Sequence, residues 1–204
     1  MKYIENGYIF PIPVGKFSKV PITKKDRKTL LDIEDYHTNI GNMASNDSYV
    51  LNKTKSLKNI FEKCIKEYVK RTYYPKNDIQ FPITQSWLNI TGKDMYHHYH
   101  KHPNSFFSGV FYLKTLGRND RLEFQSEDMF SAMFDIEHYN EFNSKTQWIN
   151  IEKHDLLLFQ SSLAHNVPIN KTTDDRISLS FNTWVSGTVG KERNNTEVIS
   201  AGIV

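Results

Sequence analysis

The spacing of apolar residues between Thr54 and Tyr73 is that of an amphipathic helix. One face of this segment is apolar, and the opposite face carries lysines and a glutamate. We expect Thr54 to cap the helix at its start and Pro75 to stop it shortly after Tyr73. The lone cysteine lies on the apolar face, where we expect it to act as a small buried side chain. The residues of that face are Leu57, Ile60, Phe61, Cys64, Ile65 and Tyr68.

A shorter helix is expected within residues 22–36. Thr23 and Asp26 have the spacing of a capping box, which opens a helix by satisfying backbone N–H groups. Leu30 and Leu31 would then face inward.

The remaining segments lack a helical period. Residues 8–17 contain prolines that suit the edge of a sheet, and residues 41–53 are polar and rich in turn formers, which predicts a loop. From Phe81 onward, short β-rich runs alternate with turns, which is typical of an antiparallel sandwich or barrel. These runs are residues 83–91, 95–100, 105–114, 121–125, 129–134, 147–152, 155–160, 165–170 and 176–185.

Two helices followed by many short strands predict an α+β fold. We expect a double-stranded β-helix core, of the jelly-roll or cupin-like kind, with the N-terminal helices packed outside it. The expected organisation is one domain in three parts. Residues 1–80 would form an N-terminal strand and helical support layer, residues 81–186 the jelly-roll core, and residues 187–204 a polar tail.

Net charge and cysteine content bear on the partners and the cellular compartment of the protein. The formal charge is +3 and the basic residues are spread along the chain, so we expect no nucleic-acid partner. A single cysteine excludes an intrachain disulfide and fits a reducing compartment. No apolar run approaches the length of a membrane span, and the N-terminus lacks a signal-peptide pattern. These features predict a cytoplasmic protein with no membrane contact and leave its oligomeric state open.

Histidines are concentrated in the segment HHYHKH, which begins at His97. Since alternate residues of a strand point to one face, His98, His100 and His102 would share a face, with His97 opposite. Imidazoles gathered in this way repel one another when protonated, and a bound metal ion relieves that repulsion. A His-rich surface patch is the alternative interpretation.

A second group of polar residues follows a long β-rich gap. His165 comes after a strand and a turn, and Arg176 opens the last long strand, with Ser178 on the same face. An arginine on a core-facing position is costly unless an anion meets it, and the far carboxylate of a dicarboxylate ligand would do so. The alternative is that Arg176 points to solvent and pairs with Asp174 or Asp175.

The order of these motifs resembles that of the 2-oxoglutarate/Fe(II)-dependent oxygenases. That family has His-x-Asp/Glu, a gap, a second His and then an Arg, often followed by a Ser two residues later. The matching segments here are HKHP, AHNVP and RIS. The sequence is more closely similar to uncharacterised phage and bacterial oxygenases of this superfamily, which share Trp-x-Asn, Ser-Gly-Val-x-Tyr-Leu and Arg-Ile-Ser-x-Ser-Phe-Asn segments. The resemblance covers residues 81–186, and its layout is that of the prolyl hydroxylases.

The resemblance implies Fe(II) as the metal and 2-oxoglutarate as co-substrate, with ascorbate keeping the iron reduced. It implies an enzyme that hydroxylates a C–H bond of a peptide or small-molecule substrate and releases succinate and carbon dioxide. His165 and Arg176 would be essential for catalysis. The implied metal ligands are His100, His102 and His165, and the implied co-substrate residues are Arg176, Ser178, Tyr112 and Asn182. Asn89 and Trp184 are further candidates for the pocket wall.

One position departs from the family motif. The usual second ligand is a carboxylate, and His102 stands in its place. Either three imidazoles hold the metal, or a carboxylate arrives from elsewhere, with Glu123 and Asp94 as the candidates.

Two other functions fit parts of the pattern. A cupin-type metalloenzyme that does not use 2-oxoglutarate also has a His-x-His motif, preceded here by Gly92. However, Ser105 lies where the cupin glutamate would stand, and a cupin does not require Arg176. A jelly-roll binding module without catalytic activity is the other alternative.

Overall fold

The computed structural model describes residues 3, 5, 7–8, 10–126, 135–190 and 197–200. Within this part of the chain the strands form three sheets. The largest has the order β1-β10-β7-β12-β5-β3-β2, and every pairing in it is antiparallel. Its strands are β1 (Val14–Phe17), β2 (Tyr36–Thr38), β3 (Met43–Ser45), β5 (Ile83–Thr91), β7 (Phe107–Lys114), β10 (Leu156–Gln160) and β12 (Arg176–Thr183).

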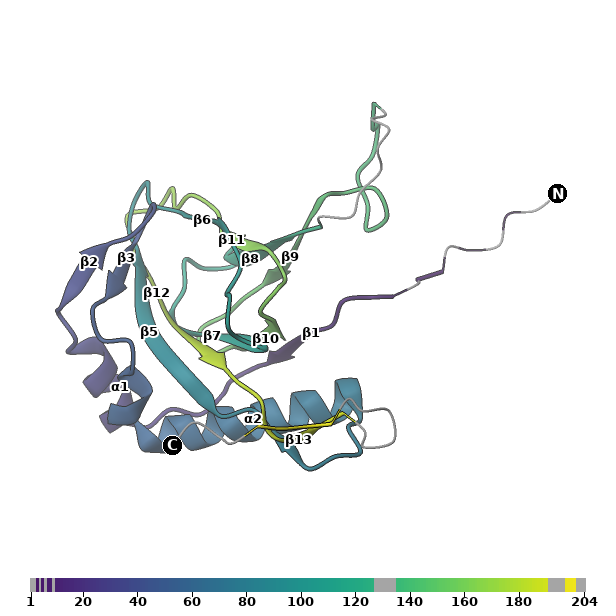
Figure 1. Cartoon of the computed structure of the whole chain (residues 1–204). Helices are drawn as coiled ribbons and strands as arrows, with labels where there is room; N and C mark the ends of the chain where they lie inside the picture. Colours follow the sequence, from purple (N-terminus) through teal and green to yellow (C-terminus); the bar gives the residue numbers. More distant parts are fainter. Residues whose placement is uncertain are drawn as a thin grey trace.

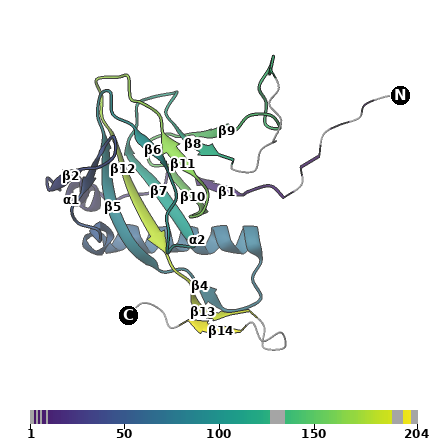
Figure 2. The same cartoon turned by 45° about the horizontal axis from the view of Figure 1, so that its top comes forward.

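A second antiparallel sheet, in the order β6-β11-β8-β9, faces the first. A small third sheet of β4, β13 and β14 lies beside the long helix α2 (Figures 1 and 2). Two facing sheets with helices outside are the jelly-roll arrangement that the sequence predicted. The bounds are β6 (His97–His100), β8 (Arg121–Gln125), β9 (Thr146–Asn150), β11 (His165–Val167), β4 (Ile79–Gln80), β13 (Ser186–Val189), β14 (Val198–Ser200), α1 (Lys24–Leu31), the 3₁₀ helix η1 (Val50–Lys53) and α2 (Lys55–Tyr73).

The large sheet is buried on both faces, and strand alternation divides its side chains between two cores. On β7, Phe111 and Leu113 contact the helical side, whereas Val110 and Tyr112 point between the sheets. On the helical side the apolar face of α2 packs against the sheet, and Figure 1 shows the helix running across one end of the strands. The inward face of β12 carries polar residues instead, and these contribute to the site described below.

The helices confirm part of the sequence pattern. The Thr23 hydroxyl accepts a hydrogen bond from the Asp26 backbone N–H at 2.9 Å, as the capping box requires. Leu30 is fully buried, but Leu31, the last residue of α1, is 36% exposed, so its predicted inward position is wrong. Consecutive residues lie about 100° apart around a helix, and of these two leucines only Leu30 faces the core. Thr54 makes no capping bond with its side chain, which corrects a second prediction.

The segment 41–53 is not the loop that its polar composition suggested. It contains β3 and η1, because the edge of β5 offers hydrogen bonds to an extended neighbour. Ser45 illustrates how a polar residue serves this pairing, since its hydroxyl accepts a bond from the Leu88 backbone N–H at 3.0 Å. Residues 8–17 do end in an edge strand, β1, as expected. The predicted run 129–134 lies outside the described residues.

None of the described helices is long and apolar enough to cross a membrane.

Gly109 in β7 leaves the space that the Phe181 ring fills. A Cβ placed on Gly109 would lie 2.1 Å from Cζ of Phe181, and Phe181 is fully buried under α2. We predict that Gly109→Ala lowers the free energy of unfolding in urea by about 1–3 kcal/mol through overpacking. Gly7→Ala is the matched control, since nothing lies within 4 Å of a Cβ there. Equal stability of the two variants would contradict this packing.

Candidate active site

Three histidines converge at one end of the second sheet, β6-β11-β8-β9. His100 ends β6, His102 follows it, and His165 opens β11 directly opposite His100 in the strand register. One ring nitrogen from each lies within 4.8 Å of the others, and Nε2 of His100 is 3.1 Å from Nε2 of His102. The structure therefore brings together the three residues that the sequence singled out as metal ligands.

The second nitrogen of each ring has a partner that sets its orientation. Nδ1 of His100 lies 2.8 Å from the backbone oxygen of His98, and Nδ1 of His165 lies 2.9 Å from that of Leu163. A carbonyl only accepts, so Nδ1 carries the proton in both rings and the Nε2 lone pair is left for a metal ion. Metal-binding histidines in proteins are commonly fixed by this kind of bond.

Asn182 fixes the third ring. Its Oδ1 lies 2.7 Å from Nδ1 of His102 and also accepts a bond from the Ser108 hydroxyl at 3.0 Å. The Trp87 ring stacks on His102 with 5.6 Å between ring centroids. The structure thus gives Asn182 a positioning contact with His102, whereas direct contact with a co-substrate stays a prediction.

Burial keeps the three imidazoles neutral. It lowers the pKa of His102 to about 4, and the neighbouring His100 ring adds to the effect. The pKa of His165 lies well below its ordinary value, and that of His100 is also lowered, in both cases chiefly through burial. Neutral imidazole is the form that binds a metal ion, so the donor set fits a transition metal at neutral pH.

His97 does not point away from the other histidines, which corrects the strand-alternation argument. Its ring stacks on His100 with centroids 4.1 Å apart, and it lines the same cavity. The reason is an irregularity in the β6–β11 pairing. His100 lies opposite His165 and His97 lies opposite Val167, so three steps along β6 span two along β11. Such a bulge turns a side chain onto the other face.

Neither candidate carboxylate joins the histidines. Glu123 is engaged by Arg121 Nε at 2.8 Å and by Asn166 Nδ2 at 3.2 Å. Asp94 pairs with Lys171 at the surface. Within the described residues, the groups of side chains close enough to hold a metal ion contain histidine alone.

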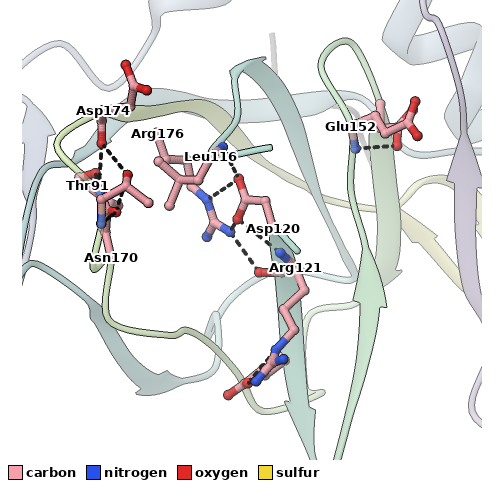
Figure 3. A network of polar contacts seen from close by, with 11 residues as sticks. Thr91, Leu116, Asp120, Arg121, Glu152, Asn170, Asp174 and Arg176 are labelled. Carbon is pink, nitrogen blue, oxygen red and sulfur yellow. Dashed lines mark hydrogen bonds and ion pairs between the residues drawn. The ribbon is translucent and has the colours of Figure 1, made fainter. Parts of the chain in front are cut away.

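Arg176 is buried rather than exposed, with 1% of its surface accessible, so the interpretation that it points to solvent is wrong. Its guanidinium forms an ion pair with Asp120, with Nε 3.1 Å from Oδ2, and donates from Nη2 to the Arg121 backbone oxygen at 2.8 Å (Figure 3). Asp120 also accepts backbone N–H bonds from Leu116 and Arg121. Asp174, one proposed partner, pairs with Lys114 instead.

Two buried donors beside this ion pair lack a partner among the described residues. They are Nη1 of Arg176 and the hydroxyl of Tyr112, and the guanidinium carbon lies 5.9 Å from the centre of the Tyr112 ring. Burial raises the pKa of Tyr112 far above its ordinary value, so the phenol keeps its proton. Buried donors of this kind are costly unless an acceptor meets them, and a carboxylate would satisfy both.

A single cavity connects the histidines with Tyr112. It encloses about 410 Å³ including its open mouth. Asn89 belongs to its wall, as expected, but Trp184 does not and instead packs edge-on against Phe106. The wall is formed by Asn42, Trp87, Asn89, Thr91, His97, His100, His102, Val110, Tyr112, Leu122, His165, Val167, Ser178 and Ser180.

The Asp120–Arg176 pair should be essential for stability. We predict that Asp120→Ala lowers the free energy of unfolding by about 3–5 kcal/mol, because it leaves a buried guanidinium unpaired. The double variant Asp120→Ala/Arg176→Met should recover part of the loss. Asp174→Ala, which removes an exposed carboxylate from a surface pair, should cost less than about 1 kcal/mol. A similar loss in Asp120→Ala and Asp174→Ala would refute the role of the buried pair.

The neutral histidines should make the metal-free protein sensitive to acid. In the unfolded chain, histidine has a pKa of about 6.5, whereas in the fold His102 titrates at about 4. The unfolded state therefore binds more protons below pH 6.5, and we predict that the free energy of unfolding falls between pH 7 and pH 5. Urea titrations across this range should show a smaller decline for His102→Gln. An identical pH dependence in both proteins would count against the lowered pKa.

Comparisons with known proteins agree with this geometry. Residues 85–182 match the model of a family described as "Putative 2OG-Fe(II) oxygenase". No curated protein matches the sequence. Among solved structures, a prolyl hydroxylase from Trichoplax adhaerens, in complex with a hypoxia inducible factor peptide fragment, has a TM-score of 0.53 at 11% identity, with 84% of this chain and 83% of that chain covered.

Two further structures show the same fold. A prolyl-4-hydroxylase from Pseudomonas putida has a TM-score of 0.52 at 10% identity, with 85% of this chain and 94% of that chain covered. HygX from Streptomyces hygroscopicus, solved with nickel, 2-oxoglutarate and hygromycin B, has a TM-score of 0.52 at 10% identity, covering 84% and 82%. The matched segment contains all three converging histidines and Arg176, and over residues 85–182 the chain is similar to the 2-oxoglutarate/Fe(II) oxygenase superfamily of enzymes.

Proposed function

We propose that this enzyme holds Fe(II) through His100, His102 and His165 and uses 2-oxoglutarate to hydroxylate a C–H bond of its substrate. The observation that carries the proposal is the convergence of one ring nitrogen from each of three histidines at a cavity that also reaches Tyr112. When bound, iron and 2-oxoglutarate supply the oxidative chemistry, in which one oxygen atom of O₂ enters the substrate and the other enters succinate as carbon dioxide leaves.

The protein residues divide the remaining tasks. The three imidazoles hold the metal, and their Nδ1 bonds keep the rings in place before the metal arrives. At the other end of the cavity, Tyr112 and Ser178 belong to the wall, and Arg176 lies behind it with its guanidinium carbon 5.9 Å from the centre of the Tyr112 ring. These three residues would hold the far carboxylate of 2-oxoglutarate. Tyr112 and Ser178 are neighbours in the β7–β12 register, which supports a joint role.

The buried donors of Arg176 and Tyr112 favour a keto-acid oxygenase over a cupin that works without 2-oxoglutarate. Arg176 uses Nε and Nη2 on Asp120 and the backbone, so a ligand carboxylate would meet Nη1 and the Tyr112 hydroxyl. A metal site alone needs neither group. Iron as the natural metal and ascorbate as its reductant are inferred from the family.

We infer a peptide or protein side chain as the substrate. The support is the shared fold with structures described as prolyl hydroxylases, one of them solved with a peptide. A small molecule is the second candidate, since HygX has the same fold and was solved with hygromycin B. The resemblance to phage oxygenases and the cytoplasmic location stay predictions from the sequence.

Binding of 2-oxoglutarate tests the proposal without a known substrate. We predict that protein loaded with Mn(II) binds 2-oxoglutarate in a calorimetric titration, and that Tyr112→Phe weakens this binding by about ten- to a hundredfold. A hydrogen bond to a charged group contributes about 1.5–3 kcal/mol. Tyr139→Phe, at a tyrosine that is 73% exposed, is the matched control and should bind like wild type.

Metal affinity should be unchanged in Tyr112→Phe. If both tyrosine variants bind 2-oxoglutarate equally well, Tyr112 does not hold the co-substrate. If wild type binds Mn(II) and not 2-oxoglutarate, the cupin alternative is favoured.

A further inference from the structure

Asn42 lines the candidate active site and carries a buried hydrogen-bond acceptor. The residue is 2% exposed and lines the same cavity as the three histidines. Its Oδ1 has no hydrogen-bond partner in the described part of the chain. An unsatisfied buried acceptor is destabilising, so a native protein that keeps one calls for a functional explanation.

The backbone around Asn42 holds this acceptor in place. Asn42 belongs to the turn between β2 and β3, where its backbone oxygen accepts a bond from Asn39 at 2.8 Å. A second backbone hydrogen bond joins the turn to the segment before β6. In it, the Tyr96 N–H donates to the Gly41 oxygen at 2.9 Å. Gly41 has φ +85°, and a Cβ there would lie 2.6 Å from the Tyr96 backbone oxygen, so the close approach requires glycine.

The side chains of Asn42 and Asn89 are linked by hydrogen bonds, and the side-chain oxygen of Asn42 takes no part in them. The nitrogen of Asn42 donates to Oδ1 of Asn89 at 3.4 Å, and the nitrogen of Asn89 donates to the Ser180 hydroxyl at 3.0 Å. Each amide therefore spends one of its two N–H groups within the wall, and the side-chain oxygen of Asn42 is left without a partner among the described residues. What the wall offers at Asn42 is an acceptor, which a ligand can satisfy only with a donor.

The cavity determines which donor suits this acceptor. Among the described residues that form its wall, none is Asp, Glu, Lys or Arg. A charged ammonium group would find no protein carboxylate there to offset the cost of its desolvation, and the carboxylates of bound 2-oxoglutarate would already be engaged by the metal and by the Tyr112 end of the cavity. At neutral pH 2-oxoglutarate is a dianion without a donor, so it cannot satisfy Asn42 either. The remaining ligand for this position is an uncharged part of the substrate.

We propose that Asn42 is a specificity-determining residue that accepts a hydrogen bond from an uncharged donor of the substrate, an amide N–H or a hydroxyl. The inference rests on the proposed function and names the substrate chemistry for that site. Two residues before Asn42 in the turn, Ile40 is 59% exposed, and Tyr96, which contacts the turn, is 41% exposed. These two side chains offer an apolar surface outside the cavity for the rest of a substrate.

Probes that share a cyclohexane ring and differ in the attached polar group test the hydrogen-bond donor separately from the rest of the ligand. Cyclohexanecarboxamide and cyclohexanol carry uncharged donors, their N,N-dimethylamide and methyl ether lack them, and cyclohexylammonium carries a charged one. Each would be titrated by calorimetry into protein loaded with Mn(II) and 2-oxoglutarate under anaerobic conditions. We expect at least one uncharged donor to bind about tenfold more tightly than its methylated partner, a difference of about 1.4 kcal/mol. The amide and alcohol arms distinguish the two donor types.

Three variants connect that difference to Asn42. Asn42→Ala should abolish the preference for the donor and leave 2-oxoglutarate affinity within about twofold. Asn42→Asp, which retains the acceptor and adds a charge, should shift the preference toward cyclohexylammonium at pH 8. Asn52→Ala, an exposed asparagine outside the cavity, should behave as wild type.

Several results would overturn the inference: equal binding of donors and their methylated partners by wild type, no binding of any uncharged donor, or a preference that survives in Asn42→Ala. A large loss of 2-oxoglutarate affinity in Asn42→Ala would assign the residue to the co-substrate instead. Failure of the proposed function is distinguishable, because it would appear as loss of Mn(II) or 2-oxoglutarate binding in wild type. If only 2-oxoglutarate binding fails, the probe series is read with Mn(II) alone, and if Mn(II) binding fails, it is read with the metal-free protein.

Discussion

The pairing of β6 with β11 is the constraint on which the site depends. It places His100 directly opposite His165 and brings His102 within reach of both. The backbone then completes the arrangement, because carbonyls in the same two segments accept the Nδ1 protons of His100 and His165. A metal ion would meet three nitrogens that are already aimed and neutral, so little of its binding energy would be spent on ordering the ligands.

The large sheet supplies the second requirement, which is a polar wall inside a buried core. Strand alternation sends Leu179 and Phe181 of β12 toward α2 and leaves Arg176, Ser178 and Ser180 on the face toward the sheet β6-β11-β8-β9. A charge on that face is tolerated because Asp120 meets it in a buried ion pair. The outcome is a cavity whose wall is uncharged, with hydrogen-bond donors at the Tyr112 end and an acceptor at Asn42.

Much of the fold, and the residues that converge at the candidate site, could be predicted from the sequence. The helical period of the chain ends at Phe81, and each predicted β-rich run after it that lies within the described residues overlaps a strand. The order of His100, His102, His165 and Arg176 pointed to one site because their residue types suit a metal and an anion. The structure brings the histidines together, while metal and co-substrate binding by the individual residues stays proposed.

What the sequence missed depends on contacts between distant segments. The bulge that turns His97 toward His100 follows from the register with β11, which no local pattern encodes. Asp120 lies in a polar turn that looks like any surface loop, and only the tertiary fold places it on Arg176. Asn42 lies in a stretch whose composition predicted a loop, and pairing of β3 with β5 carries it to the cavity.

The measurement that tests the central claim most directly is the visible spectrum of metal-free protein under strictly anaerobic conditions, recorded after addition of Fe(II) and then of 2-oxoglutarate. We predict a weak charge-transfer band that appears only when both are present and is lost in His165→Ala. No band in wild-type protein, with Fe(II) binding shown separately, would contradict chelation of the keto-acid by a metal held at the three histidines. Absence of Fe(II) binding would contradict the metal centre itself.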